Sequence, residues 1–226
     1  MPRIARIIAP HFTHHVTQRG NNRAAVFFDD EDRQTYLHLL DKYSKKFFLQ
    51  IWAYCLMDNH IHILAVPEKE DSLSRGVGLT NQVYTQYLNR KLSQSGRIWQ
   101  NRFYSCLVDN DAYLWTVARY IELNPVVTGI IDKAEDYRWS SAKAHLTGGT
   151  NSLFHSPSWL ESKQRESYCE FMLHSDNEVN KAIRKATRTG RPFGSEEFID
   201  NMELRLNQTL RPRKPGRPKK ECGEWP

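Results

Sequence analysis

Hydrophobic and polar positions alternate along the first half of the chain in a way that predicts four short strands. Each run contains β-branched, aromatic or aliphatic residues and is bounded by turn-forming residues. The strands are expected at residues 11–18, 47–56, 60–66 and 102–108. Between the first strand and the first helix, the RGNNR run at 19–23 predicts a turn, because Gly and Asn tolerate unusual backbone angles.

Apolar residues at three- and four-residue spacing predict helices between and after these strands. The helices are expected at residues 30–46, 72–94 and about 109–124. Asp29 or Asp30 is a candidate N-cap for the first helix, and Ser72 opens the second. Pro125 predicts that the third helix ends at Asn124, since the residue before a proline avoids the helical conformation.

The element order predicts an α+β sandwich, in which an antiparallel sheet carries helices packed on one face. Further helices are predicted at 139–146, 158–173, 177–188 and 195–209. Residues 211–220 contain only Arg, Lys, Pro and Gly, so they predict an extended, solvated arm. The expected domains are a catalytic unit at 1–150, a helical C-terminal extension at 151–210 and a basic flexible tail at 211–226.

Charge is concentrated at the C-terminal end of the 226-residue chain, whose formal net charge is +6. Residues 177–226 hold 12 Lys and Arg and 7 Asp and Glu, while residues 1–176 are nearly neutral. This bias indicates a polyanionic partner, with nucleic acid first, although a solubilising tail is the alternative. Dispersed cysteines and the lack of a long apolar run predict no zinc cluster, no disulfide framework and no membrane span, and hence a cytoplasmic protein. With a nucleic-acid partner, the expected location is the nucleoid.

The sharpest local feature is the sequence His60-Ile61-His62 on a predicted strand. Residues two apart on a strand point to the same face, so both imidazoles project together. Two imidazoles are half of a divalent metal site, and a third ligand has to come from elsewhere. The alternative is a strand with two polar residues facing solvent.

The second feature is Tyr120 and Asn124, which lie four residues apart on a predicted helix and therefore share a face. A tyrosine oxygen is a competent nucleophile when a metal polarises the phosphate that it attacks, and an amide oxygen is an acceptable ligand for a hard cation. The alternative is a half-buried tyrosine and a helix terminator. Glu122 points away from Tyr120, and Tyr113 is interpreted as a packing residue.

Together these residues predict a site for metal-assisted attack on a phosphodiester, and here the sequence resembles a known family. His60-Ile61-His62 matches the motif of the HUH endonucleases, and RYIELNPV (119–126) resembles the nucleophile helix of single-tyrosine transposases. With three further stretches the chain resembles the REP-associated tyrosine transposases over about residues 3–148. The stretches are HHVTQRGNNRAAVFF (14–28), GRIWQNRFYSCLVDNDAYL (96–114) and YRWSSAKAHLTG (137–148).

The resemblance implies a ferredoxin-like, RRM-like core and an active enzyme. It implies that Tyr120 is the nucleophile and that His60, His62 and Asn124 hold Mg²⁺ or Mn²⁺. The expected substrate is single-stranded DNA with a hairpin or palindrome, cleaved to a 5′-phosphotyrosine and a free 3′-OH and then rejoined. The oligomeric state stays open between monomer and homodimer.

Three segments are candidate DNA contacts. Loop and aromatic residues are expected to grip phosphates or stack on unpaired bases. They are Arg19, Asn21, Asn22, Arg23, Trp99, Gln100 and Arg102, with a structural turn or a core tryptophan as alternatives. In the tail, Arg217 lies in a Gly-Arg-Pro run similar to an AT-hook, a motif that enters the DNA minor groove. A further hypothesis is that the tail regulates cleavage, which a truncation at about residue 176 tests.

Three rival interpretations remain. A hydrolase using His60, His62 and a carboxylate such as Asp58 would form no protein adduct. A non-catalytic hairpin-binding protein would cut nothing. An RNA-binding module is disfavoured, because the strand offers His residues where such modules carry stacking aromatics.

Overall fold

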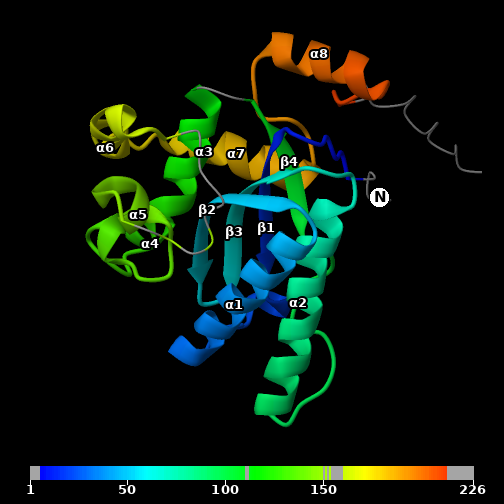
Figure 1. Ribbon diagram of the computed structural model, residues 1–226, viewed down its shortest axis with the longest axis vertical. Helices are drawn as coiled ribbons and strands as arrows, with labels where there is room; N and C mark the ends of the chain where they lie inside the picture. Colours follow the sequence, from blue (N-terminus) through cyan, green and yellow to red (C-terminus); the bar gives the residue numbers. More distant parts are fainter. Residues whose placement is uncertain (1–5, 110–111, 150, 152, 154–159, 213–226) are drawn as a thin grey trace, which may run out of the picture.

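A four-stranded antiparallel sheet forms the centre of the computed structural model, which describes residues 6–109, 112–149, 151, 153 and 160–212 (Figure 1). The strands are β1 (Thr13–Arg19), β2 (Leu49–Met57), β3 (His60–Pro67) and β4 (Tyr104–Val108). Their spatial order is β2-β3-β1-β4, and the helices α1 and α2 connect them in a βαββαβ sequence. This topology confirms the expected α+β, ferredoxin-like fold class.

Helices α1 (Asp30–Lys46) and α2 (Ser72–Lys91) cover one face of the sheet, as Figure 1 shows. Val16, Ile61 and Ile63 lie on the strands facing this layer and are fully buried. A close approach of α2 to β2 favours glycine at position 76, because a Cβ there would lie 2.8 Å from Cδ2 of Leu49, and that side chain would have to shift. The predicted helix layer is therefore confirmed for α1 and α2.

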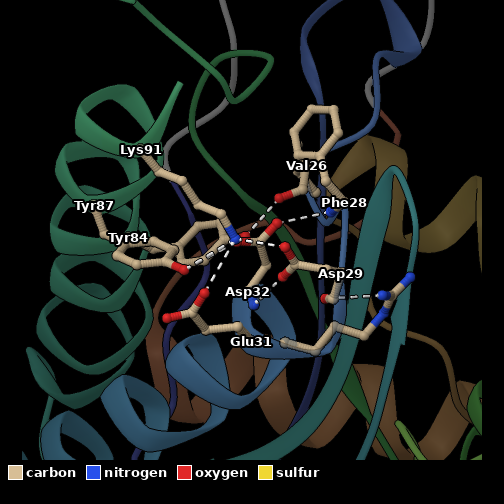
Figure 2. A network of polar contacts seen from close by, with 9 residues as sticks. Val26, Phe28, Asp29, Glu31, Asp32, Tyr84, Tyr87 and Lys91 are labelled. Carbon is tan, nitrogen blue, oxygen red and sulfur yellow. Dashed lines mark hydrogen bonds and ion pairs between the residues drawn. The ribbon is translucent and has the colours of Figure 1, made fainter. Parts of the chain in front are cut away.

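A network of charges ties the start of α1 to the end of α2 (Figure 2). The buried carboxylate of Asp32 accepts hydrogen bonds from the backbone N–H of Phe28 (2.8 Å), the hydroxyl of Tyr87 (3.0 Å) and the ammonium of Lys91 (2.7 Å). Lys91 also pairs with Asp29 at 2.7 Å, and these carboxylates raise its pKa. Asp29 in turn caps α1 by accepting from the N–H of Asp32, so one cluster both starts α1 and fixes α2 against it.

The opposite face of the sheet is covered by α3 (Ala112–Glu122) and α7 (Asn177–Thr189), and the short helix α4 (Asn124–Val127) follows α3 directly. The one-face prediction did not include this second layer. The predicted helix end at Asn124 also needs correction, since α3 ends at Glu122 and a one-turn helix follows directly. Pro125 lies in the first turn of α4, where a missing N–H has no helical partner to lose.

Chain segments cover both edges of the sheet. At the β2 edge, Leu56 donates its N–H to the carbonyl of Trp139, and Ser141 donates its N–H to the carbonyl of Tyr54. At the β4 edge, Phe193 donates its N–H to the carbonyl of Leu107 (2.8 Å). Covered edges prevent pairing with other chains, and they also bind the C-terminal segments to the sheet.

The remaining helices lie in three of the later stretches predicted to be helical, with shifted ends. They are α5 (Ala142–Thr147), α6 (Arg165–Met172) and α8 (Glu196–Leu206), with 3₁₀ turns η1 (Asn21–Arg23), η2 (Ala134–Asp136) and η3 (Ser162–Gln164). Ile183 of α7 is fully buried in the main core, whereas Met202 of α8 packs with Ile7, Ala9 and Leu107 in a second cluster. The basic tail from residue 213, including Arg217, lies outside the described residues. Within the described part, every helix is too short or too polar to cross a membrane.

Candidate active site

An open cleft with a volume of about 790 Å³ lies on the side of the sheet covered by α3 and α7. Strands β1 and β3 contribute its floor, and α3, α4 and α7 contribute its walls. Among the described residues that line the cleft, none is Asp or Glu and seven are Arg or Lys. The seven are Arg19, Arg23, Arg119, Lys181, Arg184, Lys185 and Arg188.

Three histidines lie together on the floor of this cleft. Strand register pairs His62 with Thr17 and His60 with Arg19, so the two predicted histidines share the face that also carries His15. The rings of His60 and His62 have centroids 5.0 Å apart and are nearly perpendicular. His15 stacks on His62 with centroids 5.2 Å apart and hydrogen-bonds to it, with 3.0 Å between His15 Nε2 and His62 Nδ1.

Burial keeps these imidazoles neutral. It lowers the pKa of His15 to about 3 and lowers the pKa values of His60 and His62 as well. A hydrogen bond to Asn124 partly offsets the effect on His60. A neutral imidazole keeps one nitrogen lone pair, which is what a metal ligand needs.

Tyr120 comes from α3 and lies over the two buried histidines. Its ring meets that of His62 edge-on at a centroid distance of 5.3 Å and that of His15 at 5.8 Å. Burial raises the pKa of Tyr120, while the positive charge of Arg184 and a hydrogen bond to Asn124 lower it. Asn124 thus interacts with both His60 and Tyr120, and one chain brings all four predicted residues together.

The end of α3 is held by the fully buried carboxylate of Glu122. It accepts hydrogen bonds from Ser141 Oγ (2.5 Å), His145 Nδ1 (2.5 Å) and the hydroxyl of Tyr168 (2.9 Å). Glu122 therefore points away from Tyr120, as its helix position predicted, and links the helix that carries Tyr120 to α5 and α6. Arg119 adds a second link, because its guanidinium donates to carbonyls near the end of α6 and lies 4.0 Å from the ring centre of Phe171.

The residue set fits a hard divalent cation, but only with an amide oxygen included. Within the described residues, no group of three or more His, Cys, Asp or Glu side chains is arranged to hold a metal ion. Two neutral imidazoles and the amide of Asn124 are the available donors, and such a set leaves positions for water and phosphate oxygens. His60 is suited to this role, since its Nδ1 is engaged by Asn59 Oδ1 at 2.6 Å, which leaves Nε2 as the nitrogen that would bind a metal.

The predicted DNA contacts divide into three groups. Arg19 and Arg23 line the cleft, whereas Asn21 and Asn22 are exposed on η1 but are not among the lining residues. Trp99 is only 6% exposed, and it packs against core aromatics and donates its indole N–H to the carbonyl of Asn81. Its ring therefore has no open face for a base, which contradicts the stacking prediction in favour of the core tryptophan.

The other two residues of this block lie away from the histidines. Gln100 is half-buried and donates its N–H to the carbonyl of Arg19. Arg102 is exposed and lines a second hollow of about 580 Å³ between α2 and the segment that leads into β4. A phosphate contact by Arg102 would therefore belong to a different surface from the His-Tyr cleft.

Sequence reasoning missed His15 and the cleft-facing side of α7. The alternation of β1 places His15 on the same face as Thr17, so strand parity could have marked it. Lys181, Arg184, Lys185 and Arg188 follow helical i, i+3, i+4 and i+7 spacing, which marks a basic face.

Comparison with known proteins identifies the class to which this fold and site belong. The model of the family described as "Transposase IS200 like" matches residues 9–124, which is about half of the chain and includes all four residues of the predicted site. The chain belongs to this family of transposases.

Two individual proteins are similar to this chain, one in sequence and one in structure. The chain is 28% identical over 122 residues to a REP-associated tyrosine transposase of Haemophilus influenzae, covering 50% of this chain and 67% of the relative. Its fold is similar to that of a REP-associated tyrosine transposase solved bound to a REP hairpin. That match has a TM-score of 0.57 and 21% identity, and it covers 71% of this chain and 98% of the other. These matches confirm the resemblance that the sequence motifs indicated.

Proposed function

We propose that this transposase-family chain is a metal-dependent endonuclease and strand transferase that acts on single-stranded DNA beside a palindrome. The observation that carries the proposal is the position of Tyr120, whose ring centroid lies 5.3 Å from that of His62 at the floor of a cleft whose described lining residues include cations and no carboxylate. The hairpin as substrate is carried over from the similar transposase, which was solved with a REP hairpin.

In the proposed reaction, the Tyr120 oxygen attacks the phosphorus of one phosphodiester after its phenolic proton is lost to solvent. The bond from phosphorus to the 3′ oxygen breaks, and that oxygen takes up a proton. The products are a 5′-phosphotyrosine on Tyr120 and a free 3′-OH. Attack by a 3′-OH on the phosphotyrosine rejoins the strands, and no ATP is required because each step exchanges one phosphate ester for another.

The residues around Tyr120 support this role. Burial raises the pKa of the Tyr120 phenol, and Arg184 and Asn124 both lower it, so these two residues offset part of the cost of forming the reactive phenolate. When bound, Mg²⁺ or Mn²⁺ would supply Lewis-acid polarisation of the scissile phosphate, and His60, His62 and Asn124 are the residues that would hold it. Tyr120 as sole nucleophile gives one covalent link to DNA at a time.

The cleft walls suit a nucleic-acid backbone. The Arg and Lys side chains that line it are exposed, except Arg119, which is engaged with backbone carbonyls. Clustered cations without interspersed carboxylates attract a polyanion and release its counterions. The hydrolase alternative is less well supported, because Asp58 is paired with Arg33 and is not among the residues lining the cleft.

A covalent-adduct assay tests the proposal. The protein is incubated with single-stranded DNA that carries a palindrome from beside its own gene, with Mg²⁺, Mn²⁺ or EDTA, and the mixture is separated on a denaturing gel. The expected result is a metal-dependent protein–DNA band that disappears in Tyr120→Phe. Tyr104→Phe is the matched control, since Tyr104 also lines the cleft but lies on β4, and this variant should retain the band.

Other outcomes would change the assignment. Cleavage without an adduct that persists in Tyr120→Phe would support a hydrolase. An adduct that persists in Tyr120→Phe would mean that another residue is the nucleophile. Binding without cleavage on several palindromes would support a non-catalytic hairpin-binding protein.

A further inference from the structure

A buried chain of hydrogen bonds runs from α7 to His62. The hydroxyl of Thr187 donates to the carbonyl of Ile183 one helical turn earlier, at 2.9 Å. The same oxygen lies 2.8 Å from Nδ1 of His15, and Nε2 of His15 lies 3.0 Å from Nδ1 of His62. The exposed fraction of Thr187, His15 and His62 is 5% or less, so water does not compete for these bonds.

The direction of each bond follows from the number of protons available. A threonine hydroxyl has one hydrogen, and here it is used toward Ile183, so the oxygen of Thr187 accepts from His15. Nδ1 of His15 therefore carries the proton, and Nε2 of this neutral ring is an acceptor. Nδ1 of His62 must then donate to His15, which leaves Nε2 of His62 with a free lone pair.

A second arrangement is chemically consistent and has the opposite result. If the Thr187 hydroxyl turned toward His15, every proton in the chain would reverse. His62 would then carry its proton on Nε2 and would have no lone pair on that nitrogen. The bond from Thr187 to Ile183 selects the first arrangement, and Cys106 Sγ, 3.4 Å from Thr187 Oγ1, can donate to that oxygen without disturbing it.

The other candidate ligand is oriented in the same way by a different loop. Nδ1 of His60 lies 2.6 Å from Oδ1 of Asn59, and the amide nitrogen of Asn59 donates to the carbonyl of Arg23 at 3.1 Å. This second bond fixes the amide, so Nδ1 of His60 is the donor and Nε2 keeps its lone pair. Two separate sets of hydrogen bonds therefore give His60 and His62 the same tautomer, with the proton on Nδ1, as ligation of a metal through Nε2 requires.

We infer that His15 and Thr187 are positioning residues that hold His62 as its Nδ1–H tautomer, with the Nε2 lone pair available for the divalent cation. The inference rests on the proposed role of His62 as a metal ligand. It assigns a function to α7, which lies outside the residues matched by the family model. The C-terminal extension would thereby control the chemical state of a residue on β3.

The test measures tautomers and metal affinity separately on the full chain. Long-range ¹H–¹⁵N correlation spectra of metal-free protein labelled in histidine distinguish Nδ1–H from Nε2–H rings, and the expected wild-type result is Nδ1–H for His15, His60 and His62. Thr187→Val keeps the shape of the side chain but removes the acceptor. It should produce an Nε2–H population of His62 and weaken the binding of Mn²⁺, followed by electron paramagnetic resonance, by about 10–100-fold.

Two control variants test whether a loss of Mn²⁺ affinity comes from the lost hydrogen bond or from a general effect on folding. Thr187→Ser keeps the hydroxyl and should retain the wild-type tautomers and Mn²⁺ affinity. Thr189→Val removes a hydroxyl that is exposed on the same helix and should change neither.

Three results would overturn the inference. The first is an Nε2–H tautomer of His62 in the wild type, and the second is unchanged Mn²⁺ affinity in Thr187→Val. The third is a wild-type protein with the expected tautomers that binds no Mn²⁺. That result would remove the proposed metal site itself and leave only a structural hydrogen-bond chain.

Discussion

The basic face of α7 allows a quantitative test of where single-stranded DNA binds. The perturbation is a triple variant in which Lys181, Lys185 and Arg188 are each replaced by Gln. All three are exposed and line the cleft, and Gln has a helix propensity close to that of Lys and Arg. Arg184 is left in place because its charge acts on Tyr120 and His62.

The magnitude follows from counterion release. For single strands, the logarithm of the binding constant falls with the logarithm of salt concentration by about 0.7 per phosphate neutralised. Six exposed cations line the cleft, so the wild-type slope is expected to reach about −4, and the triple variant should retain about −2. Between 50 and 200 mM salt, affinity should therefore fall about 300-fold in the wild type and about 20-fold in the variant.

Fluorescence anisotropy of a labelled single-stranded oligonucleotide in metal-free buffer measures both slopes without cleavage. The control replaces Lys42, Lys45 and Lys46 by Gln. These residues lie on α1, which contributes no residue to the cleft lining, and the net charge changes by the same amount. The reasoning is refuted if the α7 variant keeps the wild-type slope, or if both triple variants lower it equally, because charge alone and not position would then govern binding.

Three further predictions concern stability, measured as the free energy of unfolding in urea. Glu122→Ala should lose about 3–5 kcal/mol of stability, because three buried donors lose their acceptor. The control Glu170→Ala, at an exposed position of α6, should change stability by less than about 0.5 kcal/mol. Burial lowers the pKa of His14 to about 4, so the unfolded chain takes up the proton first as pH falls. Stability should therefore decline as pH falls below about 6.5, with His14 contributing up to about 3 kcal/mol by pH 4 beside the contributions of the other buried histidines, and His14→Gln should remove only that share. Gly78→Ala should gain up to about 1 kcal/mol, because the space around its Cβ is open. Gly76→Ala should be about 1–3 kcal/mol less stable than Gly78→Ala, because its Cβ meets Leu49, and equal stabilities of the two variants would contradict this tight contact.

The fold was predictable where local patterns decide it. The alternation of hydrophobic and polar residues predicted the strands, and capping residues such as Asp29 predicted helix starts. Both signals depend only on residues close in the sequence. The burial of Trp99 could not be predicted from such local patterns. Whether an aromatic ring faces water depends on what other elements bring to it, and here Phe27, Tyr36 and Tyr84 close around the indole.

The predicted site was recoverable for a similar reason. His60 and His62 share a strand face, and Tyr120 and Asn124 share a helix face, so two short spacings define four residues. The contact between His15 and Thr187 joins residues 172 positions apart. No local sequence pattern predicts this pair, because the two residues meet through the packing of α7 against the sheet, where Ile183 is buried in the main core.

The position of α7 also changes how regulation by the basic tail has to be tested. A truncation at about residue 176 would remove the tail, but it would also remove a cleft wall, a fully buried core residue and the hydroxyl that bonds to His15. Altered cleavage by that fragment would therefore say nothing about the tail. Removal of residues 213–226 leaves α7 and α8 intact, together with the ion pairs of Arg211 with Glu196 and Glu203. Only a change in cleavage by this shorter deletion can be assigned to the tail, because every described side chain that lines the cleft is still present.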